Sequence, residues 1–144
     1  MKLSRFAAGM FAFAGLSGLV AVALAALAAH ALAGIAPTGE QAVTWFREAT
    51  AFQMAHTLAL ILVTIVAERV EAGLAQRILR IAAAFMAAAV VLFPGALYSA
   101  SFNGPVIFAP FGGVAAMGGW ALFGVGAWLA SRDSSQDTSK EQQE

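Results

Sequence analysis

The run Phe6–Ala29, FAAGMFAFAGLSGLVAVALAALAA, contains 24 residues and no charged side chain. A helix of about 20 apolar residues crosses a hydrocarbon core of about 30 Å, so this run is long enough to span a membrane. The basic start Met1–Arg5 is also compatible with a signal peptide, although the apolar core of a signal peptide usually has only about 7–15 residues. The run therefore predicts a first membrane-spanning helix that is retained, with cleavage as the alternative.

Three further runs of similar length lack charged residues, at 49–67, 81–102 and 111–130. None alternates apolar and polar residues, as a strand of a membrane barrel does. Backbone groups inside lipid need partners within their own segment, which favours helices. The sequence therefore predicts an all-α membrane protein with four transmembrane helices in one bundle over residues 1–130. Residues 131–144 are polar and lack aromatics, so they predict a disordered cytoplasmic tail.

Composition supports a membrane protein over the soluble classes. Hydrophobic residues make up 60% of the 144 residues and charged residues 11%, against about 45–50% and about 25% in soluble domains. Eight Lys and Arg balance eight Asp and Glu, which argues against a nucleic-acid partner, and the absence of Cys excludes disulfides and thiolate metal sites. The expected partners are the lipid bilayer and other membrane protein subunits or a second copy of this chain.

The distribution of Lys and Arg predicts the orientation in the membrane. With a cytoplasmic N-terminus, seven basic residues fall on the cytoplasmic side and only Arg47 on the other side. The seven are Lys2, Arg5, Arg69, Arg77, Arg80, Arg132 and Lys140. Basic residues concentrate in cytoplasmic loops, so both termini are predicted to be cytoplasmic.

This orientation gives a direct test with reporter fusions. A reporter fused after Glu144 should be active in the cytoplasm, whereas one inserted near Asn103 should be active on the opposite side, because the two positions are separated by one span. Activity of the Glu144 fusion on the non-cytoplasmic side would contradict the prediction and indicate an odd number of spans or a cleaved first run.

The connecting segments carry helix and turn signals. Thr38 and Gln41 form a capping-box pattern, which predicts a short interfacial helix over Gly39–Glu48 before the second span. Gly73 is the expected break in the charged segment before the third run, and residues 103–105, Asn-Gly-Pro, predict a turn.

Small residues and one proline bear on how the helices pack. Small residues four apart, such as Gly112 and Ala116, predict close helix packing, either within a tight bundle or at a dimer seam. Pro94 lies within the third run, where it predicts a kink or an early end of the helix.

Two histidines are the ionisable residues expected at membrane depth. His30 should lie at the non-cytoplasmic end of the first helix, and His56 within the non-cytoplasmic half of the second. Gln53 lies one turn before His56, in a polar stripe that also contains Thr50, Thr57 and Thr64. We expect His30, Gln53, His56 and Tyr98 to line one polar pocket. The alternatives for the imidazoles are a neutral hydrogen-bonded ring, a proton relay or pH sensor, and a metal or haem ligand.

Five motifs in order resemble a known family. They are AAHAL at 28–32, AFQMAHTL at 51–58, LFPGALY at 92–98, APFGG at 109–113 and GW at 119–120. The chain resembles the bacterial inner-membrane family named domain of unknown function 423, similar to eukaryotic transmembrane protein 256, from the first span to Trp128. Alanines replace the family's glycines before His30, and Pro94 replaces a small polar residue. The resemblance implies a four-span inner-membrane protein and marks Gly95, Pro110, Gly112, Gly113 and Trp120 as packing or turn residues.

The sequence contains no pattern typical of catalysis, and the resemblance implies no activity. Carboxylate pairs and Ser–His motifs are absent from the apolar runs. We therefore expect no catalytic residue, no cofactor and no metal site, and we predict a non-enzymatic accessory or assembly subunit of a larger membrane system. The alternative is an oligomeric pathway for protons or small solutes that uses the polar stripe and His56. An enzyme is the third hypothesis.

Overall fold

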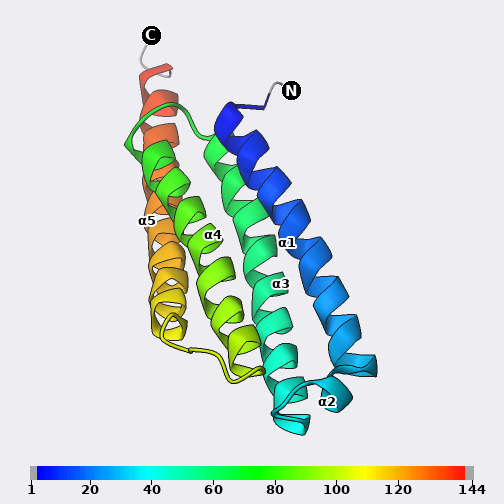
Figure 1. Cartoon of the computed structure of the whole chain (residues 1–144). Coiled ribbons are helices and arrows are strands. Elements are labelled where there is room, and N and C mark those ends of the chain that lie inside the picture. Colours follow the sequence, from blue (N-terminus) through cyan, green and yellow to red (C-terminus); the bar gives the residue numbers. More distant parts are fainter. Residues whose placement is uncertain (1–2, 142–144) are drawn as a thin grey trace.

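The computed structural model describes the backbone of residues 3–141 and the side chains of residues 3–132. Four long helices and one short helix make up this part of the chain (Figure 1). In order they are α1 (Arg5–His30), α2 (Leu32–Ile35), α3 (Glu40–Arg69), α4 (Leu74–Ala100) and α5 (Ala109–Glu141). Each long helix is apolar enough to cross a membrane. The prediction of an all-α protein with four transmembrane helices is therefore confirmed.

The four long helices lie side by side in the order α1, α3, α4, α5 (Figure 1). Each packs mainly on its neighbours in this row, and within the described chain the edge helices α1 and α5 do not contact each other. The predicted bundle is thus an open row rather than a closed bundle. An open row is stable in a bilayer because lipid chains cover the apolar outer faces of the edge helices as well as another helix would.

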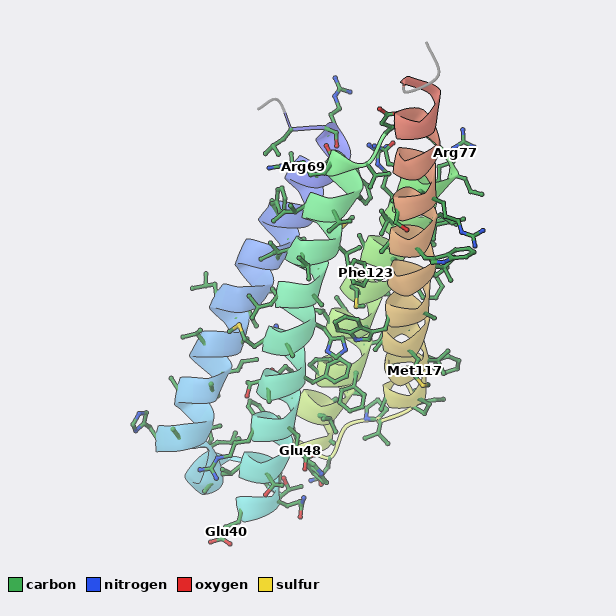
Figure 2. All side chains as sticks on the ribbon, turned by 180° about the vertical axis from the view of Figure 1, so that it is seen from behind. Glu40, Glu48, Arg69, Arg77, Met117 and Phe123 are labelled. Carbon is green, nitrogen blue, oxygen red and sulfur yellow. The ribbon has the colours of Figure 1, made fainter. Side chains whose placement is uncertain are left out.

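Both ends of the described chain lie at one end of the row, called the termini end below (Figure 1). The short helix α2 marks the opposite end, called the α2 end. Arg69 and Arg77 lie at the termini end, whereas Glu40 and Glu48 lie at the α2 end (Figure 2). This arrangement agrees with an even number of spans, and the side of the membrane on which each end lies stays a prediction.

The segment before the second span differs from the prediction. Helix α3 is continuous from Glu40, so residues 39–48 are mainly its first turns rather than a separate interfacial helix. The capping box is wrong because Gly39 occupies the N-cap position, and Thr38 lies one residue too early. The Thr38 hydroxyl instead donates to the Ser101 carbonyl at 2.8 Å. Gly39 has a φ of +57°, a conformation that glycine adopts without steric cost.

The remaining connections largely follow the sequence. Gly73 precedes the first residue of α4, as expected for the break. Pro94 is buried inside α4, which continues to Ala100, so the early helix end is wrong. The turn at 103–105 is confirmed, with Asn103 at a φ of 59° and the Gly104 amide donating to the Ser99 carbonyl at 2.9 Å.

The C-terminal segment is helical where the structure describes it. Helix α5 runs to Glu141, so the backbone of residues 131–141 continues the helix beyond the predicted domain boundary at residue 130. The predicted disordered tail covers residues 131–144, and its last three residues lie outside the described part of the chain.

The seam between α4 and α5 follows a seven-residue repeat of glycines. A Cβ atom at each of these α5 glycines would lie within 3.3 Å of α4, at residues that are themselves seven apart. The facing pairs are Gly112 with Phe93, Gly119 with Met86, and Gly126 with Leu79. A seven-residue period keeps one face of a helix turned toward its partner, and glycine permits close backbone approach. Gly112 therefore packs against the backbone of α4, and Gly119 and Gly126 pack against the side chains of Met86 and Leu79.

Candidate functional site

The Gln53 side chain is the centre of a buried polar network that joins three helices. It is 5% exposed on α3. Its Nε2 donates to the Ser17 carbonyl of α1 at 3.0 Å and to Ser17 Oγ at 3.2 Å, and its Oε1 accepts a 2.7 Å hydrogen bond from the Tyr98 hydroxyl of α4. Each polar atom of the amide thus has a partner on a neighbouring helix, which buried amides require.

The polar stripe of α3 divides into two kinds of contact. Thr57 shares a 2.8 Å hydrogen bond with Ser17, so it belongs to the network of Gln53. Thr50 and Thr64 instead donate to carbonyls of their own helix one turn earlier, at 2.8 Å to Phe46 and at 2.7 Å to Leu60. The stripe therefore faces other helices and uses its polar groups to hold α1 and α4 onto α3 and to satisfy the backbone of α3.

A shallow groove of about 260 Å³ lies over this network between α1 and α4. Ser17, Gln53 and Tyr98 contribute to its lining, and the other lining residues are apolar. Gly95 lies at the same groove, where a Cβ atom would meet nothing within 4 Å. The groove is thus an apolar surface whose polar groups already bond one another.

His56 faces α5 and lies outside that groove. Its ring stacks on Phe52, with centroids 3.8 Å apart, and lies edge-on to Trp120 at 6.3 Å. Nδ1 is 3.0 Å from the Phe52 carbonyl, and Trp120 Nε1 donates to Nε2 at 3.4 Å. An indole N–H can only donate, so Nε2 must accept and the ring proton must reside on Nδ1. The geometry therefore describes a neutral imidazole with both nitrogens engaged.

This tautomer can be observed directly. In a histidine-labelled His30→Gln protein, nitrogen NMR of His56 at neutral pH should show a protonated Nδ1 and an unprotonated Nε2, because the Trp120 indole needs an acceptor. Substituting Trp120 with Phe removes that donor, and the Nε2 resonance should shift while the Nδ1 resonance changes less. A protonated Nε2 in the unmodified protein would contradict the arrangement.

Of the four residues that were expected in one pocket, the structure brings together Gln53 and Tyr98 and places both histidines away from them. Gln53 and Tyr98 are hydrogen-bonded at the groove, whereas His56 turns toward α5. His30 is exposed at the end of α1, thirteen residues beyond Ser17, or about 20 Å of helix rise from the network. The single pocket is therefore not formed, because Gln53 and His56 on α3 face different helices and His30 lies at the exposed end of α1.

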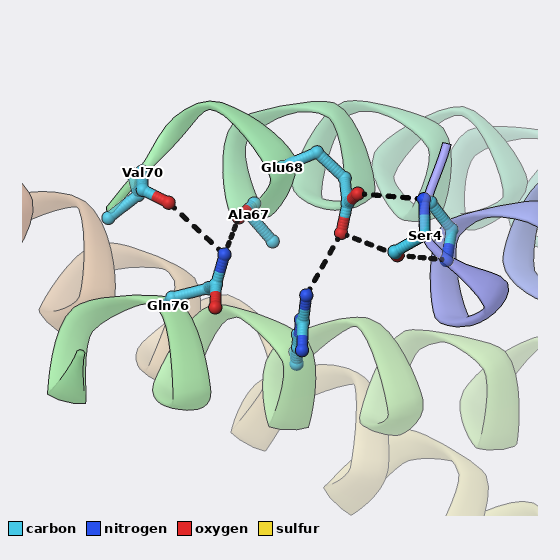
Figure 3. Close-up of polar contacts among 7 residues, drawn as sticks. Ser4, Ala67, Glu68, Val70 and Gln76 are labelled. Atoms are coloured by element: carbon cyan, nitrogen blue, oxygen red, sulfur yellow. Dashed lines mark hydrogen bonds and ion pairs between the residues drawn. The ribbon is translucent and has the colours of Figure 1, made fainter. Parts of the chain in front are cut away.

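A second polar cluster at the termini end was not predicted as a unit (Figure 3). The Ser4 hydroxyl donates to Glu68 Oε1 at 2.8 Å and accepts from the Ala7 amide at 3.1 Å, which caps α1. Arg80 Nη2 also donates to Glu68 Oε1, at 3.2 Å. Beside these residues, Gln76 binds the C-terminal end of α3 by donating to the Ala67 and Val70 carbonyls at 3.1 Å each. Two features of the sequence could have indicated this cluster. Ser4 precedes the first apolar run, and the opposite charges of Glu68 and Arg80 flank the second and third runs.

Within this cluster the Ser4 cap should contribute more to the free energy of unfolding than the Arg80–Glu68 ion pair does. Ser4→Ala should lower the free energy of unfolding by about 1 kcal/mol, because an N-cap hydroxyl is lost. The Arg80 side chain is 37% exposed, so Arg80→Met should cost less, within the ~0–1 kcal/mol of exposed pairs. Circular dichroism of unfolding in mixed detergent micelles measures both values, and a larger loss for Arg80→Met would reverse this order.

The packing residues suggested by the motifs have distinct surroundings. A Cβ atom on Gly112 would overlap the backbone and Cβ of Phe93, whereas one on Gly113 would meet nothing within 4 Å. Pro110 lies in the first turn of α5, and Trp120 faces His56. The expected packing or turn residues thus include one glycine of the α4–α5 seam, Gly112. Gly119 stood only within a family motif, and the seven-residue repeat through Gly119 and Gly126 was not predicted.

The amino-acid sequence matches the profile of a known family. The sequence profile described as "Protein of unknown function (DUF423)" matches residues 24–119, from the last turns of α1 to the first third of α5. The chain belongs to the DUF423 family. The resemblance inferred from the motifs is therefore confirmed.

Curated relatives of this DUF423 protein carry names that refer to the membrane. The chain is 36% identical over 134 residues to the UPF0382 inner membrane protein YgdD of Escherichia coli strain K12, covering 86% of this chain and 90% of the relative. It is 32% identical over 116 residues to the UPF0382 membrane protein of Haemophilus influenzae, covering 78% and 88%. No solved structure matches. With four apolar helices, the chain is a multi-pass inner-membrane protein of a family without an assigned activity.

Proposed function

We propose that this protein is a non-enzymatic accessory or assembly subunit of a larger membrane system. The observation that carries the proposal is the open row, because only a small share of the residues of its edge helices is buried. Of the most apolar segment of each helix, 17% is buried in α1 and 22% in α5, against 44% in α3 and 39% in α4. The edge helices α1 and α5 thus present more of their surface outward than the central helices do, which leaves two long faces for packing against helices of neighbouring subunits.

The use of polar groups also supports a structural role. Gln53, Ser17, Thr57 and Tyr98 bond one another across three helices, and the termini end is closed by the cluster around Glu68. These side chains hold the row together and leave the edge helices apolar. The protein then acts through the faces of α1 and α5 while α3 and α4 form its rigid centre.

Site-specific photo-crosslinking in native membranes tests this proposal. Photoreactive residues replace Leu19 on α1 and Met117 on α5, whose side chains are 68% and 66% exposed, with Leu58 on the central helix α3, 60% exposed, as the matched control. A subunit should give a protein adduct of defined mass at an edge position and mainly lipid adducts at Leu58. Lipid adducts alone at both edges, together with a monomer in membrane discs extracted without detergent, would refute the proposal.

The alternative is a proton or small-solute pathway that forms between copies. The observation that favours it is the position of the His56–Trp120 pair, because His56 is half-buried and Trp120 is 47% exposed at an open face of the row. Proteoliposomes of the purified protein measure this directly. Proton or solute flux that is lost in His56→Ala and kept in His30→Ala would support the pathway and count against the accessory role. Equal flux in vesicles with the protein and in vesicles without it would exclude the pathway.

A further inference from the structure

A basic pocket of about 420 Å³ lies at the termini end, between the α3–α4 connection and the first two turns of α4. Its lining consists of Ala72, Gly73, Leu74, Gln76, Arg77 and Arg80. Two arginines and no acidic side chain are among these residues. The pocket is separate from the Gln53 network and from His56, and the proposed accessory role does not use it.

The two guanidinium groups have hydrogen-bond donors to spare. Arg77 is exposed and has no ion pair or hydrogen bond to another described side chain. Arg80 reaches Glu68 through Nη2 only, so its Nη1 has no hydrogen-bond partner in the described part of the chain and is the donor left for a ligand, whereas its Nε is buried. A guanidinium carries five N–H donors in a planar fork that matches the oxygen atoms of a phosphate. An anion with several acceptor oxygens is therefore the ligand chemistry that fits.

The position of the pocket selects among phosphate-bearing molecules. Leu74, Arg77 and Ile81 lie on one face of α4, at spacings of three and four residues. Leu74 is 66% exposed and Ile81 is 49% exposed, so this face presents apolar side chains on both sides of Arg77 as the helix enters its membrane span. The same face can thus contact an acyl chain and a phosphate together. The first turn of α4 has no side-chain cap, so its amide groups add to the attraction for an anion.

We propose that the pocket formed by Arg77, Arg80 and the start of α4 binds the phosphate headgroup of an anionic phospholipid. The headgroup lies between the two guanidinium groups, and one acyl chain follows Ile81 along α4. The energy comes from charge-assisted hydrogen bonds at the boundary of the hydrocarbon core, where basic pockets between helices recognise anionic headgroups.

Native mass spectrometry of the full chain titrated with phosphatidylglycerol tests the site. The key variant is Arg77→Gln, and the matched control is Arg69→Gln, which removes an exposed charge at the same end but outside the pocket lining. We expect one phosphatidylglycerol to bind the wild type and Arg69→Gln equally, and Arg77→Gln to bind about fivefold more weakly, the factor for one arginine near a membrane surface. Arg77→Lys should retain more affinity than Arg77→Gln.

Three results would overturn the proposal. Equal binding by Arg77→Gln and wild type would exclude a role for the pocket. Equal losses in Arg69→Gln and Arg77→Gln would indicate general attraction to charge. Displacement of the lipid by millimolar inorganic phosphate, at a concentration that leaves phosphatidylcholine adducts unchanged, would indicate a site for a free anion. Circular dichroism of each variant, which should match the wild type because Arg77 is exposed, verifies that the fold is intact.

Discussion

Replacing Gly112 with alanine is expected to lower the free energy of unfolding by about 1–3 kcal/mol, the usual range for overpacking. A Cβ atom at this position would overlap the backbone nitrogen of Phe93 and lie 2.7 Å from Phe93 Cβ and 2.8 Å from Phe93 Cα. Backbone atoms inside α4 cannot rotate away as a side chain can, so α5 has to move outward. That movement would loosen the glycine seam over several turns, because the helices are rigid.

The adjacent glycine is a matched control for this prediction. Gly113→Ala adds the same methyl group one residue later, where nothing lies within 4 Å of it. It should leave stability unchanged or raise it by up to about 1 kcal/mol, because alanine is the better helix former. The two variants should therefore differ in sign when unfolding is followed in mixed detergent micelles. Equal values for both would show that the close approach of α4 and α5 does not limit stability.

The second large effect is expected at Gln53. Gln53→Leu keeps the approximate size of the side chain but removes the bonds to Ser17 and Tyr98. The half-buried Tyr98 hydroxyl then loses its partner beside an apolar groove. A buried polar group left unsatisfied costs about 1–3 kcal/mol, and partial exposure of this hydroxyl favours the middle of that range rather than its upper end. We expect a loss of about 2 kcal/mol in the free energy of unfolding, measured as for Gly112. The groove between α1 and α4 should widen, because α1 loses a bond to the row.

A double-mutant cycle separates the two halves of this network. Tyr98→Phe removes one hydrogen bond and should cost about 0.6 kcal/mol, the average for interhelical bonds in membranes. In the Gln53→Leu background the same change should be neutral or recover part of the loss, because it removes the hydroxyl that Gln53→Leu leaves without a partner. Additive losses would contradict the coupling of Tyr98 to Gln53. Thr64→Val, which affects a bond within α3, should leave that coupling unchanged.

The spans could be predicted from sequence because their signal is local. Uncharged runs of sufficient length specify transmembrane helices whatever their neighbours are, and Gly73 and Asn103 mark breaks through their own backbone preferences. The position of Gln53 on a face turned toward other helices was also predictable, since an amide is costly to expose to lipid. These inferences depend on the residue and its period along one helix.

The hydrogen-bond partners of the side chains depend on the arrangement of the helices in the row, which cannot be read from a single sequence. Gln53 and His56 are one turn apart and yet face α1 and α5, because α3 lies inside a row with neighbours on both sides. Thr38 fits a capping pattern in the sequence, but its hydroxyl donates to the Ser101 carbonyl instead. The packing of α3 on α4 brings these two groups together. The cluster of Ser4, Glu68 and Arg80 likewise exists only once three helix ends meet.

The open row also has a consequence for biogenesis. Every large interhelix contact joins consecutive spans, α1 with α3, α3 with α4, and α4 with α5. Each helix that leaves the insertion machinery therefore finds its docking surface already present in the helix made just before it. No span has to wait for a distant partner, so assembly can proceed hairpin by hairpin during synthesis, with short loops closed first. The last helix to arrive, α5, then packs along α4, where the glycine repeat allows the two helices to approach closely.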